Sequence, residues 1–319
     1  MRALVLGGTG WLGHAIVRDL VAEGADVTCL ARGESGDVPE GAHLIQVDRR
    51  AAGAYEPVSG EWDEVIELSC EPDLVEPALD VLADGAAHWT LVSTVSVYAS
   101  NDEPDADESA SLVEPVDLTE YADAKVAAER SSAARVGSRL LIARPGLIVG
   151  PGDPSDRFGY WPARFSRGGP TLVPMSEGRF VQVIDVADLA TWIGGAGRAG
   201  STGVVNAVGD VVAMSEFFRR VMDVTGYDGE LVEVEDEMLL AQGVHYWAGP
   251  RSLPLWLPLS AASFARRSAQ AFQETGGRAR SLEATVTEVL AGERSRGVDR
   301  PRRSGLSASE EHTVLLNVR

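Results

Sequence analysis

A tyrosine and a lysine four residues apart, Tyr121 and Lys125, are the side chains of this sequence best suited to moving a proton. A spacing of four places both on one face of a helix. A tyrosine titrates near about 10, which is high for a proton shuttle at neutral pH. An ammonium ~4 Å away favours the phenolate by about 4 kcal/mol before desolvation, at an effective dielectric constant of about 20. We therefore predict that Tyr121 is a general acid/base whose pKa Lys125 lowers.

The lysine content of the sequence supports a chemical role for this pair. The chain has 28 basic residues, and Lys125 is the single lysine among them. An ammonium is a compact point charge, whereas a guanidinium is a wide planar fork, so the two do not replace each other. A single lysine could occupy this position by chance, or the position could require an ammonium for catalysis. The neighbouring residues distinguish the two interpretations.

A loop with three glycines stands at the start of the chain. Gly7, Gly10 and Gly13 follow the apolar run Ala3–Leu6 and open a helical pattern. In a dinucleotide-binding loop the first glycine permits a tight turn, the second admits a pyrophosphate and the third lets the helix pack on the sheet. The amide groups of a helix N-terminus then face the phosphates. We expect the intervening Thr9, with Trp11 and Leu12, to contact the same ligand.

The elements that must hold these residues alternate between strand and helix. Such alternation predicts an α/β fold with a doubly wound parallel sheet, that is, a Rossmann fold. We expect strands at 3–6, 26–30, 44–47, 64–68, 88–93, 139–143, 181–184 and 203–208. We expect helices at 12–23, 74–82, 121–135 and 186–192.

The predicted domain organisation has two parts. Residues 1–150, with 178–210 returning to them, form the NAD(P)-binding domain, and residues 151–177 and 211–319 form a smaller, mostly helical substrate-binding region. Residues 292–309 are rich in arginine and glycine, and we expect them to be loose or draped over the surface.

Four motifs in this order resemble the extended branch of the short-chain dehydrogenase/reductase superfamily, which includes nucleotide-sugar epimerases, dehydratases and carbonyl reductases. They are the glycine loop, the hydroxyl-rich segment 93–98, the Tyr-x-x-x-Lys pair and the Arg-Pro segment 144–151. The resemblance implies hydride transfer to or from a nicotinamide cofactor. It also implies that Thr94 orients the reacting oxygen, that Lys125 holds the nicotinamide ribose and that Pro145 approaches the nicotinamide amide.

The tip of the second strand bears on the choice of cofactor. A carboxylate there would bind the ribose 2′-hydroxyl of NAD, but this chain has Arg32, which suits the 2′-phosphate of NADP. We therefore predict NADP(H), with NAD(H) as the alternative, although nearby Glu34 allows Arg32 to be an ordinary surface arginine. The resemblance places Asp48 at the adenine amino group. We expect Arg49 over the adenine face and Leu68 and Ser69 beside the ribose and phosphates.

The substrate is less well defined by the sequence. Sugar dehydratases of the superfamily carry Asp-Glu after the catalytic threonine, whereas Val95 and Ser96 follow Thr94 here. Arg179 keeps part of a nucleotide-sugar motif, and Tyr160 and Trp161 suggest an apolar pocket. We assign Ser96, Tyr160, Trp161 and Arg179 to a small organic substrate. A carbonyl reductase is the first expectation, a redox-cycling epimerase the second, and a non-catalytic dinucleotide sensor an alternative of another class.

The charge and composition limit the partners. A formal net charge of -20 opposes binding to nucleic acid and to anionic membranes. Neither an apolar run of membrane-spanning length nor metal-ligand spacing of His and Cys is found in the sequence. We expect no metal, a cytoplasmic protein of a high-GC bacterium, and we keep a homodimer open.

Overall fold

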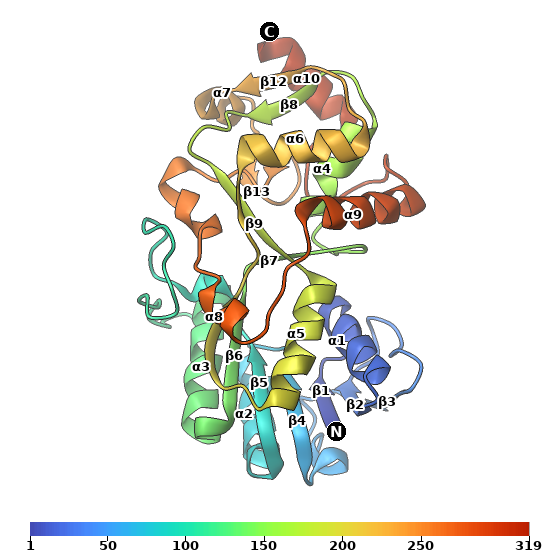
Figure 1. Cartoon of the computed structure of the whole chain (residues 1–319), viewed down its shortest axis with the longest axis vertical. Coiled ribbons are helices and arrows are strands. Elements are labelled where there is room, and N and C mark those ends of the chain that lie inside the picture. Colours follow the sequence, from blue (N-terminus) through green and yellow to red (C-terminus); the bar gives the residue numbers. More distant parts are fainter. Residues whose placement is uncertain (319) are drawn as a thin grey trace. The chain divides into compact units, whose positions relative to one another are not determined.

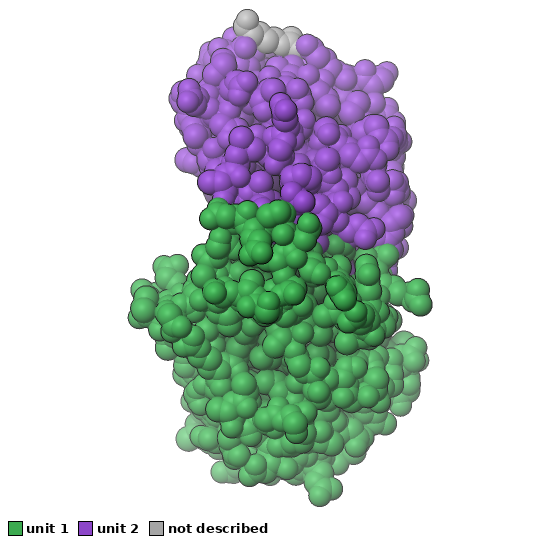
Figure 2. Space-filling view, turned by 60° about the vertical axis from the view of Figure 1, so that its left-hand side comes forward, with its two compact units in different colours: residues 1–148, 186–209, 267–279 green, residues 149–185, 210–266, 280–319 purple. Residues whose placement is uncertain are grey.

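The structure is a computed structural model that describes residues 1–318. It divides into two compact units, which Figure 2 colours separately. Unit 1 contains residues 1–148, 186–209 and 267–279, and unit 2 contains residues 149–185, 210–266 and 280 onward. Unit 2 thus takes residues 178–185, which we expected in the nucleotide-binding part, and unit 1 takes 267–279. The functional division between the two parts stays a prediction.

Unit 1 is built around a seven-stranded parallel sheet in the order β10-β6-β5-β4-β1-β2-β3. This order reverses direction at β1 and β4, as in a doubly wound fold, so the predicted fold class is confirmed. The strands are β1 (Arg2–Leu6), β2 (Asp26–Ala31), β3 (Ala42–Gln46), β4 (Trp62–Glu67), β5 (Ala86–Val92), β6 (Leu140–Pro145) and β10 (Gly203–Ala207).

Helices cover both faces of this sheet, as Figure 1 shows for α1 and α5 on one face and α2 and α3 on the other. The helices of unit 1 are α1 (Trp11–Ala22), α2 (Pro72–Leu82), α3 (Tyr121–Val136), α5 (Val186–Ala199) and α8 (Gln270–Glu274). Continuous apolar strands are required between two helical layers, and Ala3 to Leu6 of β1 are accordingly fully buried. The core beneath α2 and α3 includes Leu79 and Trp89.

Helix α5 extends seven residues beyond its expected end at Trp192, through Gly194, Gly195 and Gly197. Glycine is a poor helix former, which is why the sequence suggested a stop. The structure supplies the reason: a Cβ on Gly194 would lie 3.1 Å from Asp19 of α1, and one on Gly197 would lie 2.7 Å from Glu64 of β4. Close packing against α1 and the sheet therefore outweighs local propensity.

Unit 2 is mainly helical, in line with the prediction, and also contains several short strands. Strands β8 and β12 pair in parallel, and β9 and β11 pair antiparallel. The chain enters the unit through β7 (Leu147–Val149). The remaining elements are α4 (Arg157–Ser166), β8 (Thr171–Pro174), β9 (Phe180–Asp185), β11 (Val211–Ala213), α6 (Met214–Thr225), β12 (Leu231–Val234), α7 (Asp236–Ala241), β13 (His245–Trp247), β14 (Ser252–Pro254), α9 (Leu282–Arg296) and α10 (Ala308–Val318).

Residues 292–309, expected to be loose or draped over the surface, lie mostly at the surface but are not loose. Helix α9 continues to Arg296, and the chain after it is held by buried carboxylates. Arg300 donates to both oxygens of Glu293 at 3.2 Å, and the backbone amide of Arg303 donates to Asp156 at 2.9 Å. The composition suggested that these arginines face solvent. Instead they bind the carboxylates of Glu293 and Asp156, and these bonds hold residues 292–309 in place.

Across residues 1–318, no helix is both long and apolar enough to cross a membrane. The same residues contain no cluster of His, Cys, Asp and Glu that could hold a metal ion.

Candidate nucleotide-binding and catalytic site

The glycine loop makes the turn that joins β1 to α1. Gly7 has φ +102°, a conformation that favours glycine, and its amide donates to the Leu30 carbonyl of β2 at 3.1 Å. The Gly10 amide donates back to the Gly7 carbonyl at 3.2 Å, and Gly10 caps α1. Trp11 and Leu12 form the first residues of the helix, half-buried, and Thr9 is buried in the loop.

The glycine loop is tightly packed at Gly13 and has free space beside Gly10. A Cβ on Gly13 would collide with the Gly7 carbonyl and lie 2.9 Å from the Gly8 Cα. A Cβ on Gly10, in contrast, would meet only the Gly7 carbonyl oxygen, at 3.7 Å. Helix α1 therefore packs tightly on the loop while the backbone at Gly10 stays accessible to a ligand, and anions are stabilised at such helix N-termini.

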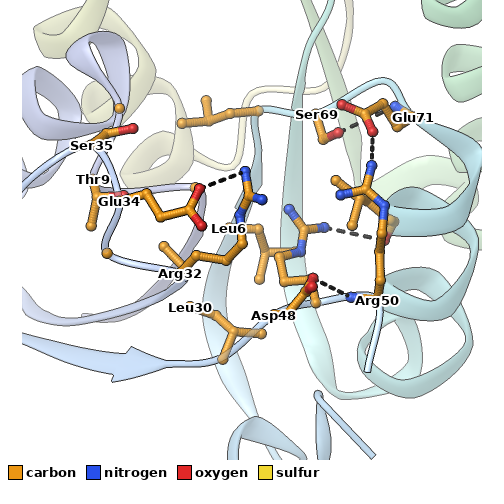
Figure 3. Close-up of a pocket in the computed structure, with 17 residues that line it drawn as sticks. Leu6, Thr9, Leu30, Arg32, Glu34, Ser35, Asp48, Arg50, Ser69 and Glu71 are labelled. Atoms are coloured by element: carbon orange, nitrogen blue, oxygen red, sulfur yellow. Dashed lines mark hydrogen bonds and ion pairs between the residues drawn. The ribbon is translucent and has the colours of Figure 1, made fainter. Parts of the chain in front are cut away.

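A cavity of about 270 Å³ lies over this loop and the ends of β2, β3 and β4 (Figure 3). Eight of the predicted cofactor residues line it, namely Gly7, Thr9, Gly10, Arg32, Asp48, Arg49, Leu68 and Ser69. The other predicted cofactor residues do not line it: Trp11, Leu12, Gly13, Tyr121, Lys125 and Pro145. The cavity thus gathers the residues assigned to the adenosine end of the cofactor.

Arg32 stands at the rim of this cavity, directly after β2. Its side chain is about half exposed and lies 3.3 Å from Glu34, a pair that Figure 3 shows. The Gln46 side chain donates to the Arg32 carbonyl at 2.9 Å, which fixes the backbone at this position. Exposed ion pairs contribute little, so Arg32 can exchange Glu34 for an incoming anion at small cost.

Arg49 lines the cavity as we expected, but its guanidinium is engaged in internal contacts. Its side chain is buried, and its Nε donates to the Tyr55 hydroxyl at 2.9 Å. Its two terminal nitrogens bind both carboxylate oxygens of Glu67, which is fully buried. Burial alone would lower the pKa of Arg49, but the charge and hydrogen bonds of Glu67 outweigh it and raise the pKa. The guanidinium is therefore a structural partner of Glu67, which argues against its covering an adenine ring.

The neighbouring Arg50 was missed by sequence reasoning. It lines the cavity, its side chain is 39% exposed, and it binds the carboxylates of Glu71 and Asp73 at the start of α2. Its amide donates to the Asp48 carboxylate at 3.0 Å. Two adjacent arginines look alike in a sequence. Both line the cavity, and the fold shows that Arg49 is buried against Glu67 whereas Arg50 is partly exposed.

Lys125 lies on the inner face of α3, against the end of β5. Its Nζ donates to the Val92 carbonyl at 2.6 Å and lies 3.5 Å from the Leu68 carbonyl. Burial lowers the pKa of this lysine, and the nearby Cys70, Glu67 and Glu129 oppose that shift. Tyr121 begins α3, and its side chain is more than half exposed. Its ring centre is 6.0 Å from Nζ.

Thr94 and Ser96 follow the same strand. Thr94 is buried, has extended backbone and caps the short 3-10 helix Val95–Val97. Its Oγ1 accepts from the Ser96 amide at 3.1 Å. Lys125 binds the carbonyl of Val92, which stands two residues before Thr94 at the end of β5. Helix α3 and Thr94 are therefore anchored to the same end of this strand.

Behind these residues lies a buried polar network that the sequence analysis did not identify. Glu129 binds Arg144 through two hydrogen bonds of 3.0 and 2.7 Å and accepts from Ser93 at 2.5 Å. Arg144 also donates to the Tyr98 hydroxyl at 3.1 Å, and Tyr98 donates to Asn206 at 2.6 Å. Glu129 stands four residues after Lys125, so the helical spacing that identified the lysine also pointed to it.

Pro145 and the predicted substrate residues of unit 2 occupy different surroundings. Pro145 is buried at the end of β6, paired with Ala207 of β10. Tyr160 and Trp161 are almost completely buried among aromatic rings, and the Trp161 indole donates to the Pro254 carbonyl. Arg179 is buried, with bonds to Asp236 and to the Leu257 and Met175 carbonyls. The expectation that Tyr160, Trp161 and Arg179 line a substrate pocket is therefore not supported, since their contacts are internal.

A model of the NAD dependent epimerase/dehydratase family matches residues 3–209. The chain belongs to this family. It is an NAD(P)-dependent enzyme of the short-chain dehydrogenase/reductase type, as the sequence predicted. The sensor alternative is thereby set aside.

Among curated proteins the chain is similar to a 2'-dehydrokanamycin reductase of Streptomyces kanamyceticus, with 30% identity over 184 residues. The match spans 54% of this chain and only 51% of that relative.

Among solved structures the chain resembles a UDP-glucose 4-epimerase of Thermus thermophilus in complex with NAD, with a TM-score of 0.64 and 20% identity over 93% of this chain and 100% of the other. It also resembles a UDP-glucuronic acid 4-epimerase of Bacillus cereus, with a TM-score of 0.68 and 13% identity over 93% of this chain and 99% of the other. At these identities the likeness shows the fold.

The residues present fit the dinucleotide that this family binds. The accessible Gly10 backbone at a helix N-terminus suits a pyrophosphate, and the cavity beside it continues to the ends of β2 and β3. Of the predicted residues, the glycine loop, Arg32 and Asp48 would hold the adenosine and phosphates. Lys125 would reach the nicotinamide ribose.

Proposed function

We propose that this protein is an NADP(H)-dependent carbonyl reductase. The observation that carries the cofactor preference is Arg32, which stands where β2 ends, lines the cavity and is paired only with an exposed carboxylate. A 2′-phosphate is a stronger partner for a guanidinium than a surface glutamate is, because it offers bidentate geometry and a higher charge. A ribose 2′-hydroxyl would gain nothing comparable from Arg32.

Binding titrations test this preference. Wild-type protein should bind NADPH at least about tenfold more tightly than NADH, and Arg32→Ala should remove most of the difference by weakening NADPH alone. Arg130→Ala is the matched control, because Arg130 is an exposed arginine of α3 that pairs with Glu114. Equal affinities of the wild-type protein for the two dinucleotides would refute the preference.

In the proposed reaction a bound NADPH supplies the hydride that adds to the carbonyl carbon of the substrate. Tyr121 donates its phenolic proton to the carbonyl oxygen, so that a ketone becomes an alcohol. Thr94 orients this oxygen, and Ser96, whose amide holds the Thr94 hydroxyl, lies beside it. The Lys125 ammonium favours the phenolate that remains on Tyr121, which then regains a proton from solvent.

The substrate we propose is a ketone on a sugar or a related small molecule. The curated relative is named for the reduction of such a group, in 2'-dehydrokanamycin. Substrate recognition would fall to residues 151–177 and 211–319. A screen of oxidised sugars, oxidised aminoglycosides and simple ketones, following NADPH absorbance, tests the class. Activity confined to simple aliphatic ketones would argue against a sugar-like substrate.

Sugar epimerisation is the second candidate, because the solved structures of similar fold include nucleotide-sugar epimerases. An epimerase returns the hydride to the same substrate, so it would turn over UDP-sugars without net consumption of NADPH. Product analysis of UDP-glucose incubations separates this outcome from reduction. A cytoplasmic location and a homodimer remain predictions.

A further inference from the structure

We propose that Arg50 covers the adenine ring of the bound dinucleotide. This inference rests on the proposed cofactor site, and it transfers to Arg50 the role that the sequence suggested for Arg49. It concerns the adenine, which NADP and NAD share, whereas the preference assigned to Arg32 concerns the 2′-phosphate.

The two adjacent arginines differ in the free energy needed to displace their guanidinium groups from their present partners. Arg49 is 7% exposed and makes hydrogen bonds to Glu67, Tyr55 and the Leu74 carbonyl. Moving its guanidinium would leave the fully buried Glu67 carboxylate without its partner, and such an uncompensated buried charge is strongly destabilising. Arg49 is therefore fixed whether or not a ligand is bound.

Arg50 is held only by carboxylates that are themselves in water. Its Nε lies 2.5 Å from Asp73 and a terminal nitrogen binds Glu71, and these two carboxylates are 58% and 55% exposed. Ion pairs of this kind contribute little because solvent screens both charges. The guanidinium can therefore keep or exchange these partners as a ligand enters.

The backbone places Arg50 at the adenosine end of the cavity. The Arg50 amide donates to the Asp48 carboxylate, and Asp48 is the residue that we expect at the adenine amino group. Figure 3 shows Arg32 and Arg50 on opposite sides of the pocket, with Asp48 between them and the Arg50 guanidinium turned toward Glu71. The apolar residues Leu30 and Leu74 also line the cavity. A planar guanidinium beside an apolar wall suits the face of an aromatic base.

Binding of fragments and of whole dinucleotides tests this assignment. In Arg50→Ala we expect the affinities for NADPH, NADH and 5′-AMP to fall by a similar factor of about ten, as for the loss of a cation–π contact. In Arg50→Lys, which keeps the charge but loses the planar stack, we expect most of the same loss. Calorimetric or fluorescence titrations measure all three ligands without a substrate.

Two results would overturn the inference. If Arg50→Ala binds all three ligands as the wild-type protein does, Arg50 does not contact the cofactor. If the loss is confined to NADPH and Arg50→Lys restores it, Arg50 binds the 2′-phosphate and not the base. Arg135→Ala is the matched control, since Arg135 is a partly exposed arginine that pairs with Asp84 outside the cavity.

The same titrations keep this inference separate from the NADP preference. If wild-type NADPH and NADH affinities are equal, the assignment of Arg32 fails while a uniform loss in Arg50→Ala still supports the adenine contact. The unfolding midpoints of the variants show whether weaker binding reflects a lost contact or a damaged fold.

Discussion

In the reaction that we propose, Tyr121 would act as an exposed group and Lys125 as a buried one. The tyrosine side chain is more than half exposed, whereas the lysine is almost fully buried and bonded to the Val92 carbonyl. An exposed phenol can exchange its proton with solvent, and a buried ammonium acts on its surroundings with little screening. The pair therefore combines a mobile proton with a fixed charge.

Replacing the tyrosine tests its part. In Tyr121→Phe we expect kcat to fall by about 10²- to 10⁴-fold, the usual contribution of general acid/base catalysis. The Kd for NADPH should stay within about twofold, because the ring is retained. Steady-state rates combined with NADPH titrations measure both quantities. A variant with near wild-type kcat would mean that another group donates the proton.

The buried lysine predicts a pH dependence of cofactor binding. Burial lowers the pKa of Lys125 from its ordinary value of 10.5, so the ammonium loses its proton at a lower pH than a surface lysine does. Because the charged form should hold the ribose, NADPH affinity should decline as pH rises through this lowered pKa. Titrations over a pH series that ends near the ordinary value of 10.5 measure it, and an affinity that stays constant throughout would contradict the assigned role.

At the level of the elements, α3 is held to the sheet by the Glu129 network as well as by the lysine. In Glu129→Gln one charged partner of the buried Arg144 is lost, and we expect destabilisation of about 3 kcal/mol. Weakened positioning of Tyr121 and Lys125 should appear as a lower kcat. Because the Glu129 charge opposes the lowering of the Lys125 pKa, its loss should also lower that pKa further. Urea unfolding measures the loss of stability, and the pH profile of kcat should move to lower pH at its alkaline side.

A second buried pair joins β4, β5 and the turn after α5. His88 binds Glu64 through Nδ1 and the Ser201 carbonyl at 2.7 Å through Nε2, and both partners accept hydrogen bonds. Below its pKa the ring carries both protons and can donate to both partners. Burial opposes this charge, but the hydrogen bond and charge of Glu64 outweigh it and raise the pKa of His88.

The pair predicts how stability varies with pH. Because the folded pKa lies above that of an unfolded histidine, the contribution is complete below about pH 6.5 and is lost as pH rises through the raised pKa. His88→Gln should be less stable than wild type by about 3 kcal/mol at pH 6, with a smaller difference at pH 9. Urea unfolding at both pH values measures this, and a difference that does not change with pH would exclude a charged ring.

The sequence predicted the elements far better than the side-chain partners. Strand–helix alternation and continuous apolar runs led to the correct sheet because those patterns reflect burial on both faces. Composition did not reveal the partners of residues 292–309, where Arg300 binds the distant Asp156 and Arg302 binds Glu293 within the same segment. The same limit applies to Arg179, Tyr160 and Trp161, whose residue types suit a ligand but whose partners lie inside unit 2.

At the scale of the whole molecule, the cofactor should stabilise the fold by mass action. A ligand at about 100 times its Kd adds about 2.7 kcal/mol to the free energy of unfolding. If Arg32 sets the preference, the melting temperature should rise more with NADP⁺ than with NAD⁺ at equal concentration. Arg32→Ala should make the two shifts equal. Thermal unfolding by circular dichroism measures the shifts, and identical wild-type shifts would oppose the preference.

The lone buried lysine has a practical consequence. Lys125 and the chain's own α-amine are the only amines of the lysine or amino-terminal type in this sequence. Reductive methylation with ¹³C-formaldehyde under conditions that expose Lys125 would therefore give one NMR signal of the lysine type, which reports on the Lys125 ammonium. The titration of this single resonance would show directly whether burial lowers the pKa of Lys125.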